Sequence, residues 1–334
     1  MADRDNEIVP VRSTVQEEKA TMDTNNTVRE ALMKIAQLAS AAIGDNQYGG
    51  NRHSANGPSK TGAQVCTLRM LPERMLVDAA KTAIKINPVN APSFGPLVAA
   101  GLTLKPMHIA VVTSKYWGPT PRQLTVSFME SADQDLRTRI LSHMNAWTRT
   151  ACVSFVETEG DGDVRISRDP GGYWSYLGTD ILHVPKNRQT MNLEAFTMNT
   201  PESEYRRVVR HETGHTLGFP HEHMRPDLVA RIDPDKAYAY FLENYGWDQQ
   251  TVDEQVLTAL DEASLMGTPA DQTSIMCYQL PDSITRDGEP ILGGTDVNET
   301  DYAFAGQIYP KPGEALIGRR SDEWAPSEDV HVHL

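Results

Sequence analysis

The residues that could do chemistry gather in one stretch, RHETGHTLGFPHEHMRPD, which begins at Arg210 and holds four histidines. His211 and His215 are four residues apart, so on an α-helix they project from one face and can offer imidazole nitrogens to the same ion. Glu212 follows His211 and points partly aside, where it can reach a water molecule on that ion. This HExxH spacing predicts a divalent metal site with a carboxylate placed as a general base.

A third ligand has to come from outside this helix, and His221 is the candidate. It follows His215 by six residues and would lie on the wrong face if the helix continued. Gly218 can take the left-handed conformation that ends a helix, and Pro220 disfavours continuation, so the chain can turn and bring His221 to the ion. Three neutral histidines with an open fourth position are typical of catalytic zinc. A helix end with solvated histidines is the simpler alternative, and we interpret His223 as a surface histidine or as support for a ligand.

Composition places the chain among globular proteins and argues against several partners. It has 334 residues, of which 39% are hydrophobic and 23% charged, enough to bury a sizeable core. Lys and Arg total 31 against 45 Asp and Glu, and the net charge of -14 disfavours nucleic acid or an anionic membrane as the main partner. No apolar run has the length of a signal peptide or a membrane span, so we expect a cytoplasmic protein or export by a non-classical route. The oligomeric state is not indicated.

Periodicity indicates the elements that must position these residues. An amphipathic helix is expected over 27–43, a loop over 44–63 and a second helix over 72–84. A helix over 133–149 and the motif helix over 203–218 follow, with mostly helical structure over 233–265 and mostly irregular structure over 271–309. Short strands rich in β-branched and aromatic residues are expected at 109–117, 124–130, 153–157, 163–167 and 181–185. The pattern favours a twisted mixed sheet backed by a helix.

Two motifs resemble those of a known family. HETGHTLGFPHE is similar to the HExxHxxGFxHE signature of the astacin family of metzincin zinc peptidases, and SIMCY at 274–278 resembles that family's SxMxY turn beneath the metal. Segments in the family's order extend the resemblance over about 110–310. It implies an α+β metzincin-type zincin fold with a twisted mixed sheet, a backing helix and an active-site helix. It also implies a smaller, mostly irregular and helical C-terminal subdomain and an extra helical N-terminal region.

The resemblance divides the chain into an N-terminal region at 1–107, a catalytic domain at 108–310 and a tail at 311–334. Within the catalytic domain it implies an upper subdomain at 108–221 and a lower subdomain at 222–310. The N-terminal region is either a removable propeptide or a permanent helical layer, and two amphipathic helices favour the layer. As a propeptide it offers two weak candidates for blocking zinc, Asp45 and Cys66.

The resemblance also assigns roles to single residues. It implies one zinc ion on His211, His215 and His221, with Glu212 as general base and acid. Met276 becomes the hydrophobic floor, and Tyr278 becomes a further ligand at rest that swings away to stabilise the oxyanion, unless it is only a packing tyrosine. Glu222 binds either a new N-terminus or, as a local ion pair, Arg225.

The function implied is that of a zinc-dependent endopeptidase on protein or peptide substrates. A substrate is expected to lie extended along an edge strand within 180–196. A metallohydrolase acting on a non-peptide amide and a catalytically silent peptide-binding zincin are the alternatives. The chain departs from the family in its cysteines, because Cys66, Cys152 and Cys277 cannot supply two disulfides, and each is most simply a small buried hydrophobic residue.

Overall fold

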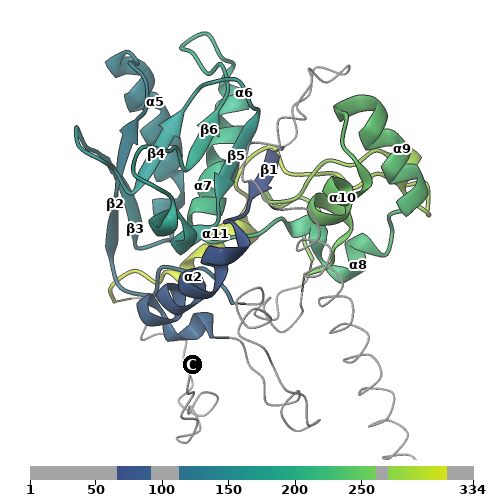
Figure 1. Cartoon of the computed structure of the whole chain (residues 1–334), viewed down its shortest axis with the longest axis horizontal. Coiled ribbons are helices and arrows are strands. Elements are labelled where there is room, and N and C mark those ends of the chain that lie inside the picture. Colours follow the sequence, from purple (N-terminus) through teal and green to yellow (C-terminus); the bar gives the residue numbers. More distant parts are fainter. Residues whose placement is uncertain (1–65, 92–112, 261–269, 314–334) are drawn as a thin grey trace, which may run out of the picture. The chain divides into compact units, whose positions relative to one another are not determined.

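The computed structural model of the chain describes residues 66–91, 113–260 and 270–313 (Figure 1). All of these belong to one compact unit made of Gly50–Pro92 and Ile109–Leu334. The helix predicted at 27–43, the loop at 44–63, Asp45 and the tail beyond residue 313 lie outside the described residues. Only residues 66–91 of the region 1–107 are described, so the division of the chain at residue 107 stays a prediction.

The described residues form a six-stranded sheet in the order β1-β5-β6-β4-β2-β3. Strands β2, β3, β4 and β6 are parallel, β5 runs antiparallel to β6, and β1 runs parallel to β5. Their bounds are Cys66–Arg69 (β1), Arg122–Phe128 (β2), Val153–Glu157 (β3), Val164–Ser167 (β4), Tyr173–Tyr176 (β5) and Met191–Leu193 (β6). The mixed sheet confirms the predicted fold class.

Three of the expected strands are observed, as β2, β3 and β4, and two expectations are wrong. Residues 181–185 lie largely in the 3₁₀ helix Gly178–His183, and residues 113–117 have no strand, while 109–112 are not described. Ile181 and Val184 are buried in the core, which accounts for the apolar character of this segment. A short apolar run in a buried turn cannot be distinguished from a buried strand by periodicity. Strands β5 and β6 were not expected, and neither contains the β-branched residues that indicated β2, β3 and β4.

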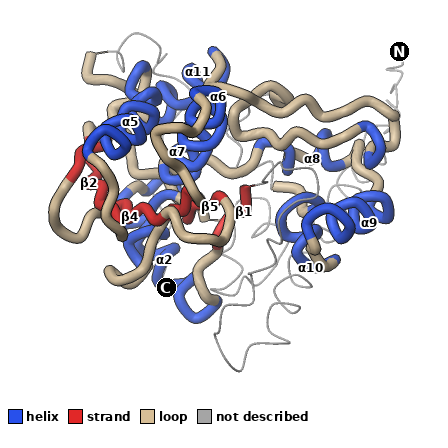
Figure 2. The backbone as a smooth tube through the Cα atoms, turned by 90° about the horizontal axis from the view of Figure 1, so that it is seen from above, coloured by secondary structure: helices blue, strands red, loops and turns tan. Residues whose placement is uncertain are grey.

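The backing helix and the motif helix lie side by side. Helix α5 (Gln134–Met144) continues as the 3₁₀ turn Asn145–Arg149, so the predicted helix over 133–149 is confirmed with a tighter last turn. The motif helix runs as α6 (Glu202–Glu204), a π-helical turn (Tyr205–Val209) and α7 (Arg210–Thr216). Seen from above in Figure 2, α5 and α7 lie on one side of the row of strands and α2 on the other. Their buried side chains join those of the sheet in one core, including Leu136, Ile140, Met144, Trp147, Val208 and Val209.

The chain after α7 forms a second, smaller core. Its helices are α8 (Pro226–Val229), α9 (Pro234–Tyr245) and α10 (Gln249–Val252), followed by the π-helical turn Asp253–Leu257. Buried aromatic rings fill this core, with Phe241 stacked on Trp247 at 5.0 Å between centroids. Helix α11 (Glu299–Ile308), in a region predicted to be mostly irregular, returns to pack in the first core.

The N-terminal piece of the described chain packs on the same unit. Helix α2 spans Glu73–Ile86, close to the predicted 72–84, and the 3₁₀ turn Pro88–Asn90 follows it. Its small residues Ala79, Ala80 and Ala83 are buried, and Leu71 and Val184 share a cluster with Ala79. Short side chains let α2 approach the body of the protein closely. Strand β1 and helix α2 are therefore bound to the unit that holds the motif helix.

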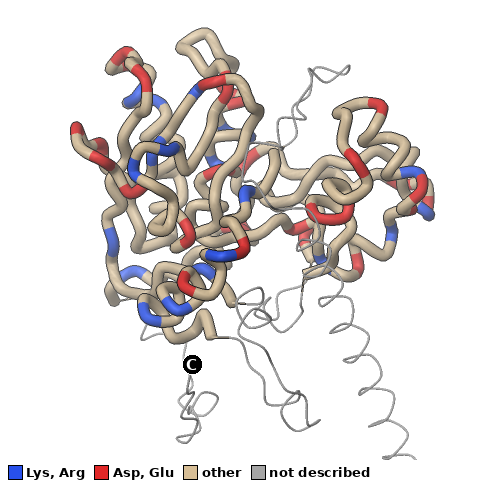
Figure 3. Tube along the Cα trace, in the orientation of Figure 1, with Lys and Arg blue, Asp and Glu red and all other residues tan. Residues whose placement is uncertain are grey.

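Charged residues are interspersed along the described chain. Figure 3 shows Lys and Arg interspersed with Asp and Glu over the described part of the chain. This distribution gives no sign of the basic stripe that a nucleic-acid backbone requires. Among the described helices, none has the length and apolar character needed to cross a membrane.

Candidate metal centre

Helix α7 carries the first two histidines on one face. The rings of His211 and His215 lie 4.7 Å apart between centroids and perpendicular to each other. Both side chains are buried, as are Glu212 and Gly214 between them. The π-helical turn just before α7 shifts the helix face by a fraction of a turn, a feature often found next to functional sites. The HExxH spacing thus gives the geometry expected from the helix repeat.

A tight turn at Gly218 brings the third histidine to the other two. Gly218 has a φ of 94°, its N–H donates to the His215 carbonyl at 2.8 Å, and the N–H of Phe219 donates to the Gly214 carbonyl at 3.0 Å. The rings of His215 and His221 then lie 4.5 Å apart, and those of His211 and His221 lie 5.3 Å apart. The structure therefore brings the three predicted histidines together, and the turn at Gly218 places His221 beside the other two.

Substituting alanine at Gly218 is expected to destabilise this turn. A Cβ there would lie 3.0 Å from the Lys115 carbonyl oxygen, in addition to the cost of a left-handed conformation. We expect Gly218→Ala to lower the free energy of unfolding by about 2–3 kcal/mol and to weaken metal binding, because His221 follows the turn. Gly246→Ala is the matched control: its φ is 69° but no atom lies within 4 Å, so about 1 kcal/mol is expected. Urea unfolding of both variants measures the difference, and equal losses would contradict the role of the close contact.

The imidazoles are oriented by hydrogen bonds behind them. The Nδ1 atoms of His211 and His215 lie 2.6 Å and 2.8 Å from the carbonyl oxygens of Ile275 and Phe219. A ring that donates through Nδ1–H presents the lone pair of Nε2 on its other side. The Nε2 atoms of His215 and His221 face each other at 3.0 Å, and the buried Nε2 of His211 has no hydrogen-bond partner among the described residues.

This arrangement fits a divalent cation. The 3.0 Å between the two Nε2 atoms is close to the separation of about 3.3 Å expected for two ligands that each lie about 2.0–2.1 Å from a tetrahedral zinc. Burial lowers the pKa of His211 to about 4 and holds the pKa values of His215 and His221 well below the usual range. The rings are therefore neutral near pH 7, which is the form that binds metal.

Glu212 lies next to this cluster and is fully buried. Among the described residues, neither of its oxygens has a hydrogen-bond partner of good geometry, although the Cys66 thiol interacts with it. Burial raises the pKa of Glu212 to about 8, and the thiol and the charge of Arg207 oppose this shift. A buried carboxylate without a partner is costly, so the group is placed for a ligand or a water molecule rather than for stability.

Met276 forms a floor beneath α7. A Cβ at Gly214 would lie 2.3 Å from the Met276 sulfur, so the turn that carries Met276 fits against the helix only at a glycine. Asp301 anchors this turn: its carboxylate accepts from Ser274 Oγ at 2.6 Å and from the N–H of Ile275 at 2.9 Å. The floor is thus tied to the first turn of α11.

Tyr278 packs against the rings of His221 and His223. Its ring is 4.3 Å from that of His221 and stacks on that of His223 at 4.1 Å. Its hydroxyl donates a short hydrogen bond to the backbone carbonyl of Cys66. His223 itself is fully buried and its Nε2 lies 2.9 Å from the Gln255 carbonyl oxygen, so the surface alternative for His223 is wrong.

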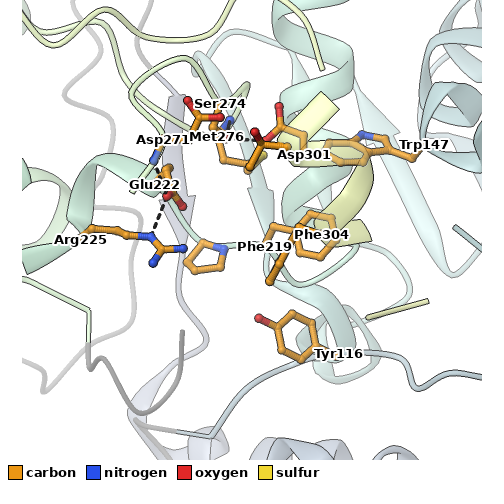
Figure 4. A pocket seen from close by; sticks show the side chains of 12 residues that line it. Tyr116, Trp147, Phe219, Glu222, Arg225, Asp271, Ser274, Met276, Asp301 and Phe304 are labelled. Carbon is orange, nitrogen blue, oxygen red and sulfur yellow. Dashed lines mark hydrogen bonds and ion pairs between the residues drawn. The ribbon is translucent and has the colours of Figure 1, made fainter. Parts of the chain in front are cut away.

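Glu222 pairs with Arg225 in the structure. Arg225 Nε lies 2.6 Å from Glu222 Oε1, which also accepts from the N–H of Asp271 at 3.1 Å. Burial raises the pKa of Glu222 to about 7, and Arg225 opposes this shift. Figure 4 shows Arg225 pointing toward Glu222 in a pocket that is also lined by Tyr116, Phe219, Met276 and Asp301. The local ion pair, one of the two alternatives for Glu222, is therefore formed.

Two residues that matter at this site carried little or no signal in the sequence. Cys66 joins the three histidines in a group whose nearest ligand atoms all lie within 4.8 Å of one another. It was only a weak candidate because nothing near it in sequence resembles a ligand motif. Asp301 was not singled out, although Asn298 and Asp301 have the spacing of a capping box, which they form. That spacing predicts a helix start but not the hydrogen bonds to the turn.

Comparison with known proteins agrees with this geometry. The family profile named Astacin, which describes a peptidase family, matches residues 111–291. Zinc metalloproteinase nas-27 of Caenorhabditis elegans is 25% identical over 201 residues, which are 56% of this chain and 44% of the relative. Meprin A subunit alpha of Rattus norvegicus is 26% identical over 208 residues, which are 60% of this chain and 24% of the relative.

A solved structure of myroilysin superposes with a TM-score of 0.56 at 29% identity, covering 60% of this chain and 98% of that one. The chain spans less than half the length of the two curated relatives described above. The profile covers more than half of the chain and includes both motifs, so the resemblance seen in the sequence is confirmed. The chain belongs to the astacin family of zinc peptidases.

Proposed function

We propose that this chain is a zinc-dependent endopeptidase. The observation that carries the proposal is the convergence of three buried imidazoles beside a buried carboxylate without a partner of good geometry. A structural zinc site would be closed, usually by cysteines, and would have no use for such a carboxylate. Membership of a zinc peptidase family supports the same conclusion.

In this proposal His211, His215 and His221 hold the zinc. Zinc bound by three histidines acts as a Lewis acid on a peptide carbonyl and makes water a nucleophile near neutral pH. Glu212 takes a proton from the attacking water and returns it to the amine that leaves. The burial of Glu212 keeps bulk water away, so that the proton passes between the carboxylate and the reacting groups.

Tyr278 is proposed to donate a hydrogen bond to the oxygen that becomes negative as the carbonyl is attacked. Its hydroxyl already bonds a backbone carbonyl, that of Cys66, which supports a role in binding peptide carbonyls. A substrate strand cannot lie along β6, the strand within 180–196, because β6 has neighbours on both sides in the sheet. Strand β5 is also paired on both sides, with β6 and with β1, so a substrate could add to β5 only in place of β1.

Tyr278→Phe is expected to lower kcat for peptide hydrolysis by about 100-fold, the usual effect of removing one donor to an oxyanion. KM should change much less, because the hydrogen bond gains strength only as charge develops. Initial rates over a range of peptide concentrations separate the two constants. Tyr240→Phe, at a tyrosine outside the metal centre, is the control. An unchanged kcat in Tyr278→Phe would mean that the Tyr278 side chain only packs in the core.

Mass-spectrometric cleavage profiling of a peptide library tests the function directly. We expect cleavage of internal peptide bonds that stops with a chelator and returns with zinc. Parallel incubation with cell-wall fragments tests the alternative of a metallohydrolase that acts on a non-peptide amide. Such an enzyme would cleave the fragments and leave peptides intact. A silent zincin would cleave neither.

The N-terminal region is proposed to act as a layer on the catalytic unit, at least over residues 66–90. Support comes from the pairing of β1 with β5 and from the hydrogen bonds of Asn90, whose Nδ2 donates to the carbonyls of Ala83 and Tyr116 at 2.9 Å and 2.8 Å. We propose that Glu222 keeps Arg225 as its partner while this layer is in place, because the ion pair is already formed.

A further inference from the structure

The last turn of α7 is capped by side chains from two distant parts of the chain. Carbonyls at the end of an α-helix have no partner inside the helix. The Nε1–H of Trp117 donates to the Thr216 carbonyl at 2.8 Å. The Tyr309 hydroxyl donates a short hydrogen bond to the next carbonyl, that of Leu217. The donors lie 99 and 92 positions away from these carbonyls in the sequence, so tertiary contacts fix the end of the motif helix.

The two caps are also joined to each other. The Tyr309 hydroxyl accepts from the backbone N–H of Trp117 at 3.2 Å, so this one hydroxyl both donates and accepts. Trp117 is 1% exposed and Tyr309 is 0% exposed, so bulk water cannot take over either hydrogen bond. A buried carbonyl that loses its donor stays unpaired, which is costly. The need to keep both carbonyls paired therefore fixes the place where α7 ends.

The capped carbonyls directly precede the turn at Gly218, which leads to the third histidine. His211 and His215 are each oriented by a backbone carbonyl behind Nδ1. The Nδ1 of His221 is buried and has no hydrogen-bond partner among the described residues. The direction of this ring therefore depends on the backbone that carries it. A metal ligand has to lie within a few tenths of an ångström of its place, so the turn must be held tightly.

The other end of the segment 218–222 is tied to the same part of the chain as Tyr309. The N–H of Glu222 donates to the Met276 carbonyl at 2.8 Å. The turn of Met276 is anchored by Asp301, which lies in the first turn of α11. Tyr309 directly follows the last residue of α11. Residues at both ends of α11 thus hold the segment that carries the third histidine.

We propose that Tyr309 is a positioning residue for the metal centre: its hydroxyl, together with the indole of Trp117, fixes the end of α7 and thereby the place of His221 on the metal. The proposal rests on the proposed function only for the assignment of His221 as a ligand. Tyr309 lies beyond residues 111–291, which match the family profile. Loss of a group that orients a metal ligand typically lowers metal affinity or activity by about 10–100-fold.

Zinc affinity tests the proposed role without reference to activity. Tyr309→Phe removes the hydroxyl and keeps the ring, and we expect its dissociation constant for zinc to rise about tenfold or more. Tyr205→Phe is the matched control, because Tyr205 is also fully buried in the first core and its hydroxyl donates to the Thr197 carbonyl at 3.0 Å. Competition with a chelator of known affinity measures both variants. An unchanged zinc affinity in Tyr309→Phe would overturn the proposal.

Thermal unfolding of the metal-free proteins separates positioning from a general loss of stability. Each of the two variants leaves one backbone carbonyl without its hydroxyl donor, so we expect similar falls in Tm. Zinc affinity should fall in Tyr309→Phe and stay unchanged in Tyr205→Phe. Equal loss of zinc affinity in both variants would make the Tyr309 hydroxyl a general stabilising contact and would contradict positioning.

Trp117→Phe tests the other cap and does not depend on how Tyr309→Phe folds. It removes the indole N–H that the Thr216 carbonyl accepts and keeps an aromatic ring. We expect the zinc dissociation constant to rise here too, by about tenfold or more. In the double variant the rise should be smaller than the product of the two single effects, because both caps hold one turn. Unchanged zinc affinity in Trp117→Phe, or effects that multiply fully, would contradict a shared role.

Peptide hydrolysis at saturating zinc separates this inference from the proposed function. We expect Tyr309→Phe to lower kcat by about 10–100-fold, with a much smaller change in KM, because the misplaced ligand affects the reacting centre more than peptide binding. Weaker zinc binding in Tyr309→Phe, with no hydrolysis even by the unchanged chain, would keep the positioning role and reject the peptidase. Hydrolysis and zinc affinity that are both unchanged in Tyr309→Phe would keep the peptidase and reject the positioning role.

Discussion

Replacing Glu212 with glutamine is expected to lower kcat/KM for peptide hydrolysis by about 10²–10⁴-fold, the range that one general acid–base group contributes. Glutamine keeps the size of the side chain but cannot take a proton from water. Zinc content should stay at one ion per chain, because Glu212 is outside the group of converging ligand atoms. Stability should not fall, since the buried carboxylate has no partner of good geometry among the described residues to lose.

Initial rates of Glu212→Gln and of the unchanged chain on the same peptide give the comparison. Elemental mass spectrometry measures zinc in the same samples, and thermal unfolding checks the fold. Glu159→Gln is a matched control, because this glutamate is exposed and away from the centre. Retained turnover in Glu212→Gln would remove the glutamate from the mechanism, whereas loss of zinc would make it a ligand instead.

Replacing His221 with alanine is expected to abolish measurable hydrolysis and to lower zinc affinity by more than about 100-fold. Removing a group that only supports a ligand already costs up to about 100-fold, so loss of a ligand should exceed this. Only His211 and His215, both on α7, would remain as histidine ligands, because the turn at Gly218 would no longer be followed by a third imidazole. Competition with a chelator of known affinity measures the loss.

His223→Gln provides the matched control for His221→Ala. His223 is two positions further along, is equally buried and faces the Gln255 carbonyl, yet it does not belong to the group of four ligand residues. We expect this variant to keep one zinc ion per chain. Equal loss of zinc from both variants would mean that general disruption of the buried cluster, and not the loss of a ligand, explains the effect.

Much of the metal centre could be predicted from the sequence because its geometry is local. His211 and His215 meet through the helix repeat, and Gly218 with Pro220 places His221 within a single turn. The backing helix over 133–149 was also predictable, since its apolar side chains recur with the helix period. Strands β5 and β6 were not predicted, because neither contains the β-branched residues that indicated the other short strands.

By itself, then, the sequence determined the candidate ligands, the neighbouring glutamate and the family resemblance, all of which follow from spacings of a few residues. Only the tertiary structure decided that Asp301 anchors the turn of Met276 and that β1 pairs with β5 beside the histidines. Cys66 and Tyr278 are 212 positions apart, and no local spacing encodes their hydrogen bond. Such contacts form because buried surfaces must fit together across the whole fold, and that requirement leaves no periodic trace along the chain.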